Sequence, residues 1–138
     1  MKRTVALTLV FLSLALMLCG CLAHGNVNHV HKTVGESTVY TKAEIEDAMD
    51  VVIRHFRREF TGCTLIHLYF DEDAPAQYSE GWAKQYDADE AIILLSSFEV
   101  GPEGPEGSLN PNSTYNGWQW ILTRNKGGPW TLRTSGVC

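Results

Sequence analysis

Residues 41–62 carry the pattern that most constrains the fold, an amphipathic helix with a clear start and a clear end. Thr41 and Glu44 have the spacing of a capping box, in which each side chain accepts a hydrogen bond from the backbone N–H of the other residue. Apolar residues then recur on one side of the helix, at positions 45, 48, 49, 52, 56 and 60. Gly62 follows as a stop signal. The spacing predicts a helix over residues 42–61 that buries this stripe, with Phe56 in the core.

Four later segments are predicted to be strands, because they are short, rich in β-branched and aromatic residues, and bounded by turn-forming residues. They span residues 63–70, 91–100, 116–124 and 129–138. The second is almost continuously apolar, which is typical of a strand covered on both faces. The connection between the first two is expected to hold a short helix, and the Gly- and Pro-rich connection after the second is expected to be an exposed loop.

Residues 1–20 have the features of a secretory signal, namely Lys2 and Arg3 followed by an uncharged, mainly apolar run from Val5 to Leu18. That run is shorter than the roughly 20 residues needed to cross a bilayer as a helix. The segment 18–21 (Leu-Cys-Gly-Cys) resembles the lipobox of bacterial lipoproteins. This resemblance implies that Cys21 is acylated and becomes the new N-terminus. The protein is then expected at the cell membrane, facing outside the cytoplasm and anchored by its lipid.

The remaining chain is predicted to be a flexible tether over residues 21–39 and one α+β domain over residues 40–138. Residues 30–39 of the tether can form a weak edge strand. Without residues 1–20, nine Lys and Arg face sixteen Asp and Glu, a formal charge of −7. Nucleic acid requires clustered basic residues, so we expect no nucleic-acid partner. The sequence shows no polybasic patch that would supplement the lipid.

Candidate metal ligands and catalytic residues are few. His24, His29 and His31 have a spacing that can collect a transition metal, but no thiolate or carboxylate is placed to complete a site, so we expect no metal and no cofactor. The acidic triplet at 71–73 lacks the spaced ligands of a calcium loop. The sequence contains no G-x-S-x-G, H-E-x-x-H, C-x-x-C or Walker motif. We therefore assign no catalytic residue.

Two structural cysteines remain, Cys63 and Cys138. Cys63 begins the first predicted strand and Cys138 ends the fourth, and in four successive antiparallel strands these positions lie at the same end of the sheet. We predict a disulfide between them, which would close a loop that includes all four predicted strands. The alternative is a free, buried Cys63 that acts as a small apolar residue, with Cys138 as a terminal thiol.

The order of elements, one helix and then four strands, resembles the cystatin-like and NTF2-like folds. Three local patterns resemble small uncharacterised bacterial lipoproteins of the NTF2-like type: C-x-L-x-x-L-Y at 63–69, W-x-W-I-L-x-R at 118–124 and W-x-L at 130–132. The resemblance implies one long N-terminal helix packed on a curved four-stranded antiparallel sheet.

A non-catalytic binding or accessory domain is the favoured function, because the chain combines a lipid anchor with a tryptophan-rich hairpin and lacks catalytic motifs. A small molecule or a protein partner would contact the candidate residues Trp82, Trp118 and Trp130. A closed apolar interior would favour binding at the outer surface.

Two alternatives belong to other classes. A cystatin-like peptidase inhibitor would present residues 128–130 (Gly-Pro-Trp) at a hairpin tip, although the Q-x-V-x-G motif of cystatins is missing. An NTF2-like enzyme acting on a small molecule would need an acid or base, such as His67 or Asp71, inside the cone formed by the sheet.

Overall fold

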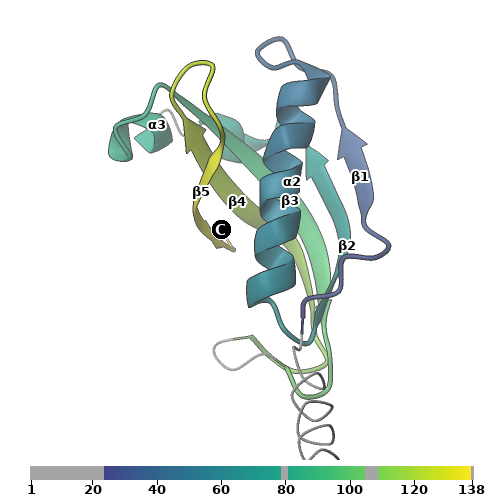
Figure 1. Cartoon of the computed structure of the whole chain (residues 1–138). Helices are drawn as coiled ribbons and strands as arrows, with labels where there is room; N and C mark the ends of the chain where they lie inside the picture. The colour runs from purple at the N-terminus through teal and green to yellow at the C-terminus, as the bar shows by residue number, and fades with distance from the viewer. Residues whose placement is uncertain (1–23, 79–80, 105–108, 138) are drawn as a thin grey trace, which may run out of the picture.

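A computed structural model describes residues 24–78, 81–104 and 109–137 of the chain (Figure 1). Five strands form one sheet, in the same order across the sheet as along the chain. They are β1 (His31–Val34), β2 (Cys63–Phe70), β3 (Glu90–Val100), β4 (Thr114–Arg124) and β5 (Thr131–Gly136). The long helix α2 (Lys42–Glu59) covers one face of the sheet, and η1 (Pro75–Tyr78) and α3 (Gly81–Gln85) lie between β2 and β3 along the chain.

Helix α2 begins and buries its stripe as predicted. The Thr41 hydroxyl accepts from the Glu44 N–H at 3.2 Å, and the Glu44 carboxylate accepts from the Thr41 N–H at 2.7 Å, which completes the capping box. The apolar positions Ile45, Ala48, Met49, Val52 and Phe56 are all buried. The helix ends at Glu59, slightly earlier than expected, and Gly62 then takes a positive φ of 79°.

The predicted fold class is wrong. The sheet is mixed and has five strands, not four antiparallel ones, and more residues lie in strands than in helices. The additional strand is β1, which pairs in parallel with β2 through the register His31↔His67 to Val34↔Phe70. Helix α2 is therefore the crossover of a β1–α2–β2 unit, the connection that parallel neighbours require.

Strand β1 falls within residues 30–39, where the sequence allowed a weak edge strand, but four residues without apolar alternation could not reveal its parallel pairing with β2. Three of its residues are exposed and only Val34 packs against the core. The strand is held by its ladder with β2 and by hydrogen bonds just before it, where Asn26 bridges to Thr64 and Gly25 N donates to Arg57 O at 2.9 Å. Part of the segment assigned to a tether is thus hydrogen-bonded to the domain.

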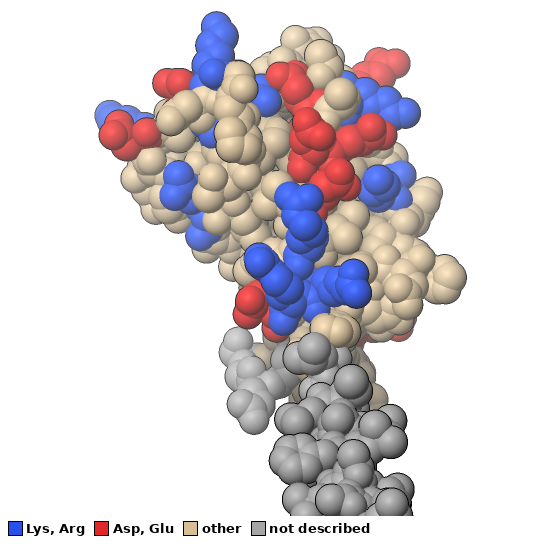
Figure 2. Space-filling view, in the orientation of Figure 1, with Lys and Arg blue, Asp and Glu red and all other residues tan. Residues whose placement is uncertain are grey.

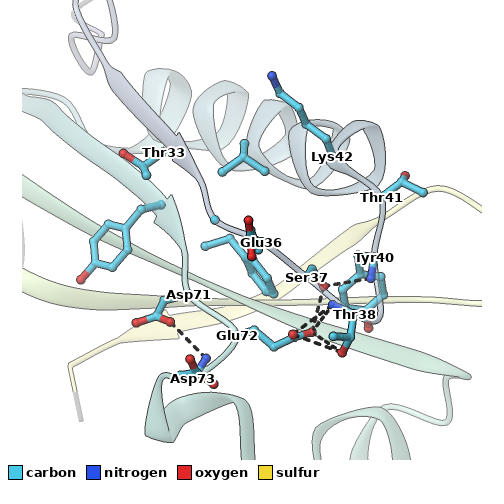
Figure 3. A pocket seen from close by; sticks show the side chains of 14 residues that line it. Thr33, Glu36, Ser37, Thr38, Tyr40, Thr41, Lys42, Asp71, Glu72 and Asp73 are labelled. Atoms are coloured by element: carbon cyan, nitrogen blue, oxygen red, sulfur yellow. Dashed lines mark hydrogen bonds between the residues drawn. The ribbon is translucent and has the colours of Figure 1, made fainter.

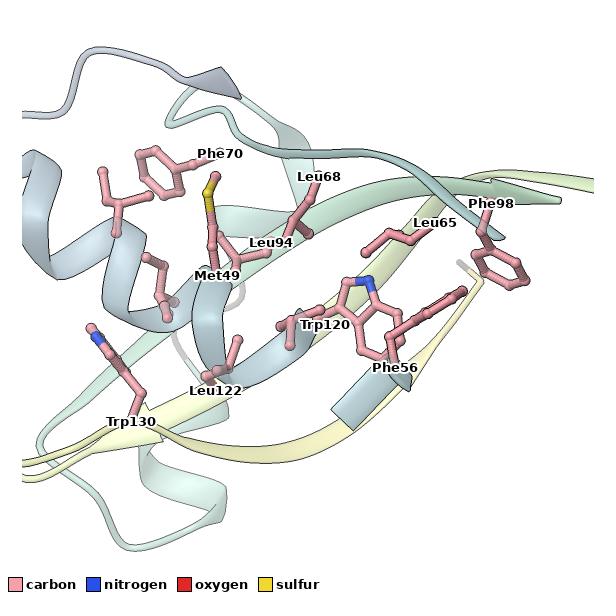
Figure 4. Packing of buried hydrophobic residues seen from close by; sticks show 14 of the residues in the cluster. Met49, Phe56, Leu65, Leu68, Phe70, Leu94, Phe98, Trp120, Leu122 and Trp130 are labelled. Carbon is pink, nitrogen blue, oxygen red and sulfur yellow. The ribbon is translucent and has the colours of Figure 1, made fainter. Parts of the chain in front are cut away.

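The antiparallel pairing of β2 to β5 follows the predicted strand order, with a register shift in each pair. Between α2 and this sheet lies a closely packed apolar core (Figure 4). Trp120 is fully buried there, and its indole N–H donates to the Ser96 hydroxyl at 2.8 Å, which satisfies the one polar atom that the ring brings inside. The interior is therefore filled by side chains of the helix and the sheet.

The opposite face of β3 is also covered, as predicted for its apolar sequence. Ile93 is 2% exposed, and its backbone carbonyl accepts a hydrogen bond from the side-chain amide of Gln77 in η1 at 2.6 Å. In α3, the Trp82 ring stacks with Tyr86 at 6.4 Å between centroids. The predicted short helix in this connection is confirmed, with five residues in α3.

Charge is divided along the outer face of α2. Glu46, Asp47 and Asp50 lie in the N-terminal half, whereas Arg54, Arg57 and Arg58 lie in the C-terminal half. Figure 2 shows the result, an acidic band above a basic cluster on one face of the molecule. This arrangement complements the helix dipole.

Candidate binding groove

A surface groove of about 930 Å³ lies where β1 and β2 both end (Figure 3). Because these two strands are parallel, their carboxyl ends meet at one edge of the sheet, and the loops that follow them face each other. One wall is the segment between β1 and α2, and the other is the segment after β2. The lining side chains that carry polar groups are Thr33, Glu36, Ser37, Thr38, Tyr40, Thr41, Lys42, Tyr69, Asp71, Glu72 and Asp73.

Glu72 joins the two walls of the groove. Its carboxylate accepts from the backbone N–H of Thr38 at 3.0 and 3.1 Å and from the Ser37 hydroxyl at 2.9 Å. The Thr38 hydroxyl adds contacts at 3.2 and 3.3 Å. The backbone hydrogen bond from Thr38 is the main reason that the pKa of Glu72 is lowered. Glu72 is therefore ionised, and its carboxylate oxygens already accept hydrogen bonds from the opposite loop.

The loop after β1 is also fixed to the core. The Ser37 hydroxyl accepts from the N–H groups of Val39 and Tyr40, and the Tyr40 hydroxyl donates to the Ala91 carbonyl at 2.9 Å. A side chain at Gly35 would place its Cβ 2.9 Å from the Phe70 carbonyl oxygen, so only glycine permits the observed approach of the two strand ends. The groove is therefore shaped before any ligand arrives.

Acidic side chains dominate the charged groups of the groove. Asp71 accepts from the backbone N–H of Asp73 at 3.0 Å and so orders the turn that follows β2. The carboxylates of Glu36 and Asp73 make no hydrogen bond to another described residue, and Lys42, on the rim, lies 3.9 Å from Glu46. The described residues contain no cluster of three His, Cys, Asp or Glu that could hold a metal ion. The free carboxylates are suited to bind an organic cation or a basic side chain.

His67 lies outside the helix–sheet interior. Its Nε2 is 2.8 Å from the Thr33 hydroxyl, and its ring stacks with His31 at 4.9 Å and with Tyr69 at 4.7 Å. Burial, followed by the neighbouring His31, lowers the pKa of His67. The enzyme hypothesis required this imidazole or Asp71 inside the cone, whereas His67 lies on the sheet face away from α2 and Asp71 lies at the groove.

The three tryptophans proposed as contact residues lie in three different environments. Trp130 is 6% exposed, donates from Nε1 to the Glu44 carbonyl at 3.0 Å and lies under the Arg124 guanidinium at 4.2 Å. Trp118 packs in an aromatic cluster with Phe60, and its buried Nε1 has no hydrogen-bond partner among the described residues. Trp82 is half-buried on α3. The structure does not bring them together, and none lines the groove.

Arg124 organises the same end of the domain, and the sequence analysis did not single it out. Its guanidinium donates to Glu44 and to Glu90 at 2.6 Å each, and its side chain is only 9% exposed. The hydrogen bond from Arg124 is the main reason that the pKa of Glu44 is lowered. The capping box of α2 is in this way tied to the start of β3 and the end of β4. The position of Glu44 in the capping box was visible in the sequence, but its distant partner on β4 was not.

Cys21 and Cys138 lie outside the described residues. Cys63 is 1% exposed within the core, and burial raises the pKa of its thiol. Three strand spacings, about 14 Å in a flat sheet, separate β2 from β5. The chain after β5 would have to cover most of that distance, because a disulfide needs Cα atoms within about 7 Å. The bond stays a prediction, and thiol titration of the denatured, unreduced protein decides it.

Among the described residues, no helix is both long enough and apolar enough to cross a bilayer. No family model matches the chain, and no match was found among curated proteins or among solved structures.

Proposed function

We propose that this protein is a lipid-anchored binding domain outside the cytoplasm and that its groove binds a partner through a cationic group. The anchor is Cys21, for the reasons that the sequence provides. The groove follows from a single observation, a preformed hollow whose charged rim leaves the Glu36 and Asp73 carboxylates free. The class of partner is a basic peptide segment or an amine-bearing small molecule.

The rest of the domain supports binding over catalysis. The space between α2 and the sheet is occupied by apolar side chains, so a ligand must dock on the outside. Trp130, on which the inhibitor hypothesis depends, is buried under Arg124 and is not displayed at the hairpin tip. The Thr33 hydroxyl is exposed, and the His67 imidazole beside it is half-buried and stacked on aromatic rings. Within the described residues, no carboxylate is hydrogen-bonded to this imidazole to orient it as in a catalytic triad.

The groove is tested by calorimetric titration of the processed protein with a trilysine peptide. E36Q/D73N removes two carboxylates that make no hydrogen bond to another described residue, and D47N/D50N removes two from the outer face of α2 as a matched control. We expect Kd to rise about tenfold in the groove variant, with a change under about twofold in the control. The K42Q variant lacks the cationic side chain at the rim of the groove and should bind the trilysine peptide slightly more tightly. Equal losses in the two double variants, or no binding at low salt, would overturn the proposal.

The anchor is tested separately. Replacing Cys21 by Ala should release the protein from the membrane fraction and abolish labelling with a radioactive fatty acid. Labelling that persists at full strength would move the modification to another residue.

A further inference from the structure

The basic end of α2 lies beside the point where the described chain begins. Gly25 N donates to the Arg57 carbonyl at 2.9 Å, and a Cβ at Gly25 would lie 2.3 Å from the Phe56 carbonyl oxygen. The backbone at Gly25 therefore packs directly against the last turn of α2. The chain from Cys21 to Gly25 can span about 14 Å at most. A lipid on Cys21 would hold this end of the domain close to the bilayer.

Three arginines occupy that end. Arg54, Arg57 and Arg58 are exposed and stand at i, i+3 and i+4, so they share one face of the helix. Beside Arg57 is a hollow of about 360 Å³ whose other walls are His24, Gly25, Asn26, Val27 and Asn28. Figure 2 shows basic side chains gathered at the lower end of this face of the molecule. The three arginines lie within residues 54–58 of the sequence, and the helix places them on one face.

The acidic groups lie mainly at the other end. Glu44, Glu46, Asp47 and Asp50 belong to the first half of α2, and the groove with Glu36, Asp71 and Asp73 is at the far end of β2. Near the basic end, Glu59 neighbours Arg58, Glu99 lies on the opposite face of the sheet, and Glu103 follows β3. An anionic bilayer would attract one end of this domain and repel the other.

We propose that Arg54, Arg57 and Arg58, with the hollow beside Arg57, bind the anionic phospholipid headgroups of the membrane that carries the anchor. This inference depends on the proposed lipid anchor for its location. The contact turns the domain so that the groove points away from the bilayer. The eight residues of β2 separate the two ends by about 26 Å, which is well beyond the Debye length of about 8 Å at physiological salt.

The test uses the processed full-length protein in vesicles of phosphatidylcholine alone or with about 30% phosphatidylglycerol. Phenylglyoxal modifies accessible arginines, and mass spectrometry of the digest gives the rate at each one. We expect anionic lipid to slow modification of Arg57 and Arg58 about fivefold and to leave Arg133, on β5, unchanged. About 0.5 M salt should restore the rates, because the contact is electrostatic. Equal rates in the two kinds of vesicle would overturn the inference.

Two further measurements make the result specific. In R57Q/R58Q the protection of Arg54 by anionic lipid should fall below about twofold, whereas K84Q/K126Q, which removes two exposed lysines elsewhere, should keep it. The same digests report whether the Cys21 peptide carries a fatty acid. An unmodified Cys21 with protected arginines rejects the anchor and keeps the headgroup contact. A modified Cys21 with unprotected arginines keeps the anchor and rejects the headgroup contact.

Discussion

The two ends of the α2–sheet interface are held together by different forces. At the end of α2 near Cys63, the rings of Phe56, Phe60, Phe98, Trp118 and Trp120 pack with centroids 4.7 to 6.4 Å apart. At the groove end, Tyr40 packs edge-on against Phe70 and Trp130, and charged groups are added to this packing. Arg124 pairs with Glu44 and Glu90, and the Glu72 carboxylate is hydrogen-bonded across the two loops. The aromatic end depends mainly on removing apolar surface from water. His55 packs against Phe60 and Trp120 there, and burial lowers the pKa of its imidazole, so protonation costs some stability at this end too. The ionic end keeps charged groups in partial contact with water, as a surface that exchanges ligands must.

The largest effect should come from the aromatic end. Phe56 is fully buried and contacts Phe60, Phe98 and Trp120, so Phe56→Ala should lower the free energy of unfolding by about 3–5 kcal/mol in urea titration. Val39→Ala, at a side chain that is 66% exposed, is the control and should stay within about 0.5 kcal/mol. A loss below about 1 kcal/mol for Phe56→Ala would show that this end does not carry the stability.

A smaller loss is expected at the ionic end. Arg124→Met removes two hydrogen bonds and the cation over the Trp130 ring, and it should cost about 1–3 kcal/mol at neutral pH. Arg133→Met, on the neighbouring strand and more exposed, is the matched control. If Arg124→Met is as stable as the original protein, the charged network adds nothing beyond what methionine supplies by packing.

The smallest effect concerns pH. The folded-state pKa values of Glu44 and Glu72 are lowered, so their bonds contribute stability above the unfolded pKa of about 4.3 and lose it as the pH falls through the lower folded values. Hydrogen exchange should therefore show the segment 35–41 opening below about pH 4.5 while α2 stays protected. E72Q should open the same segment already at pH 7, and E46Q should not. Simultaneous loss of protection in both regions would remove the distinction between the two ends.

The difference between local and long-range interactions also explains which elements the sequence could predict. The stripe from Ile45 to Phe56 and the apolar run in β3 are local patterns with one physical meaning, so the helix and its buried face followed directly. Strand β1 has no such pattern, because His31, Lys32 and Thr33 are exposed and the strand is stabilised by β2. The sequence allowed only a weak edge strand over residues 30–39, and its parallel pairing with β2 makes the sheet mixed, so the predicted fold class is wrong.

The groove could not be predicted from the sequence, for a related reason. The sequence shows Glu72 as part of an acidic triplet. Its partners Ser37 and Thr38 lie before α2 in the chain, and no sequence motif identifies them as partners of Glu72. The need for glycine at position 35 becomes clear only from the nearby Phe70 carbonyl oxygen, which leaves no room for a Cβ. The sequence analysis favoured three tryptophans, of which Trp118 and Trp130 pack within the domain and Trp82, on α3, stacks with Tyr86. Pairings between distant polar residues need the fold before they can be assigned.

One measurement tests the central claim most directly, namely that the groove is the binding surface. Hydrogen–deuterium exchange of the processed protein in vesicles, with and without saturating trilysine peptide, reports every backbone segment at once. The account predicts that exchange slows about threefold or more in the segments 35–42 and 71–73 and stays unchanged at the C-terminal end of α2 and in β5. Protection centred on any other surface, or none at a peptide concentration that gives binding heat, would contradict it.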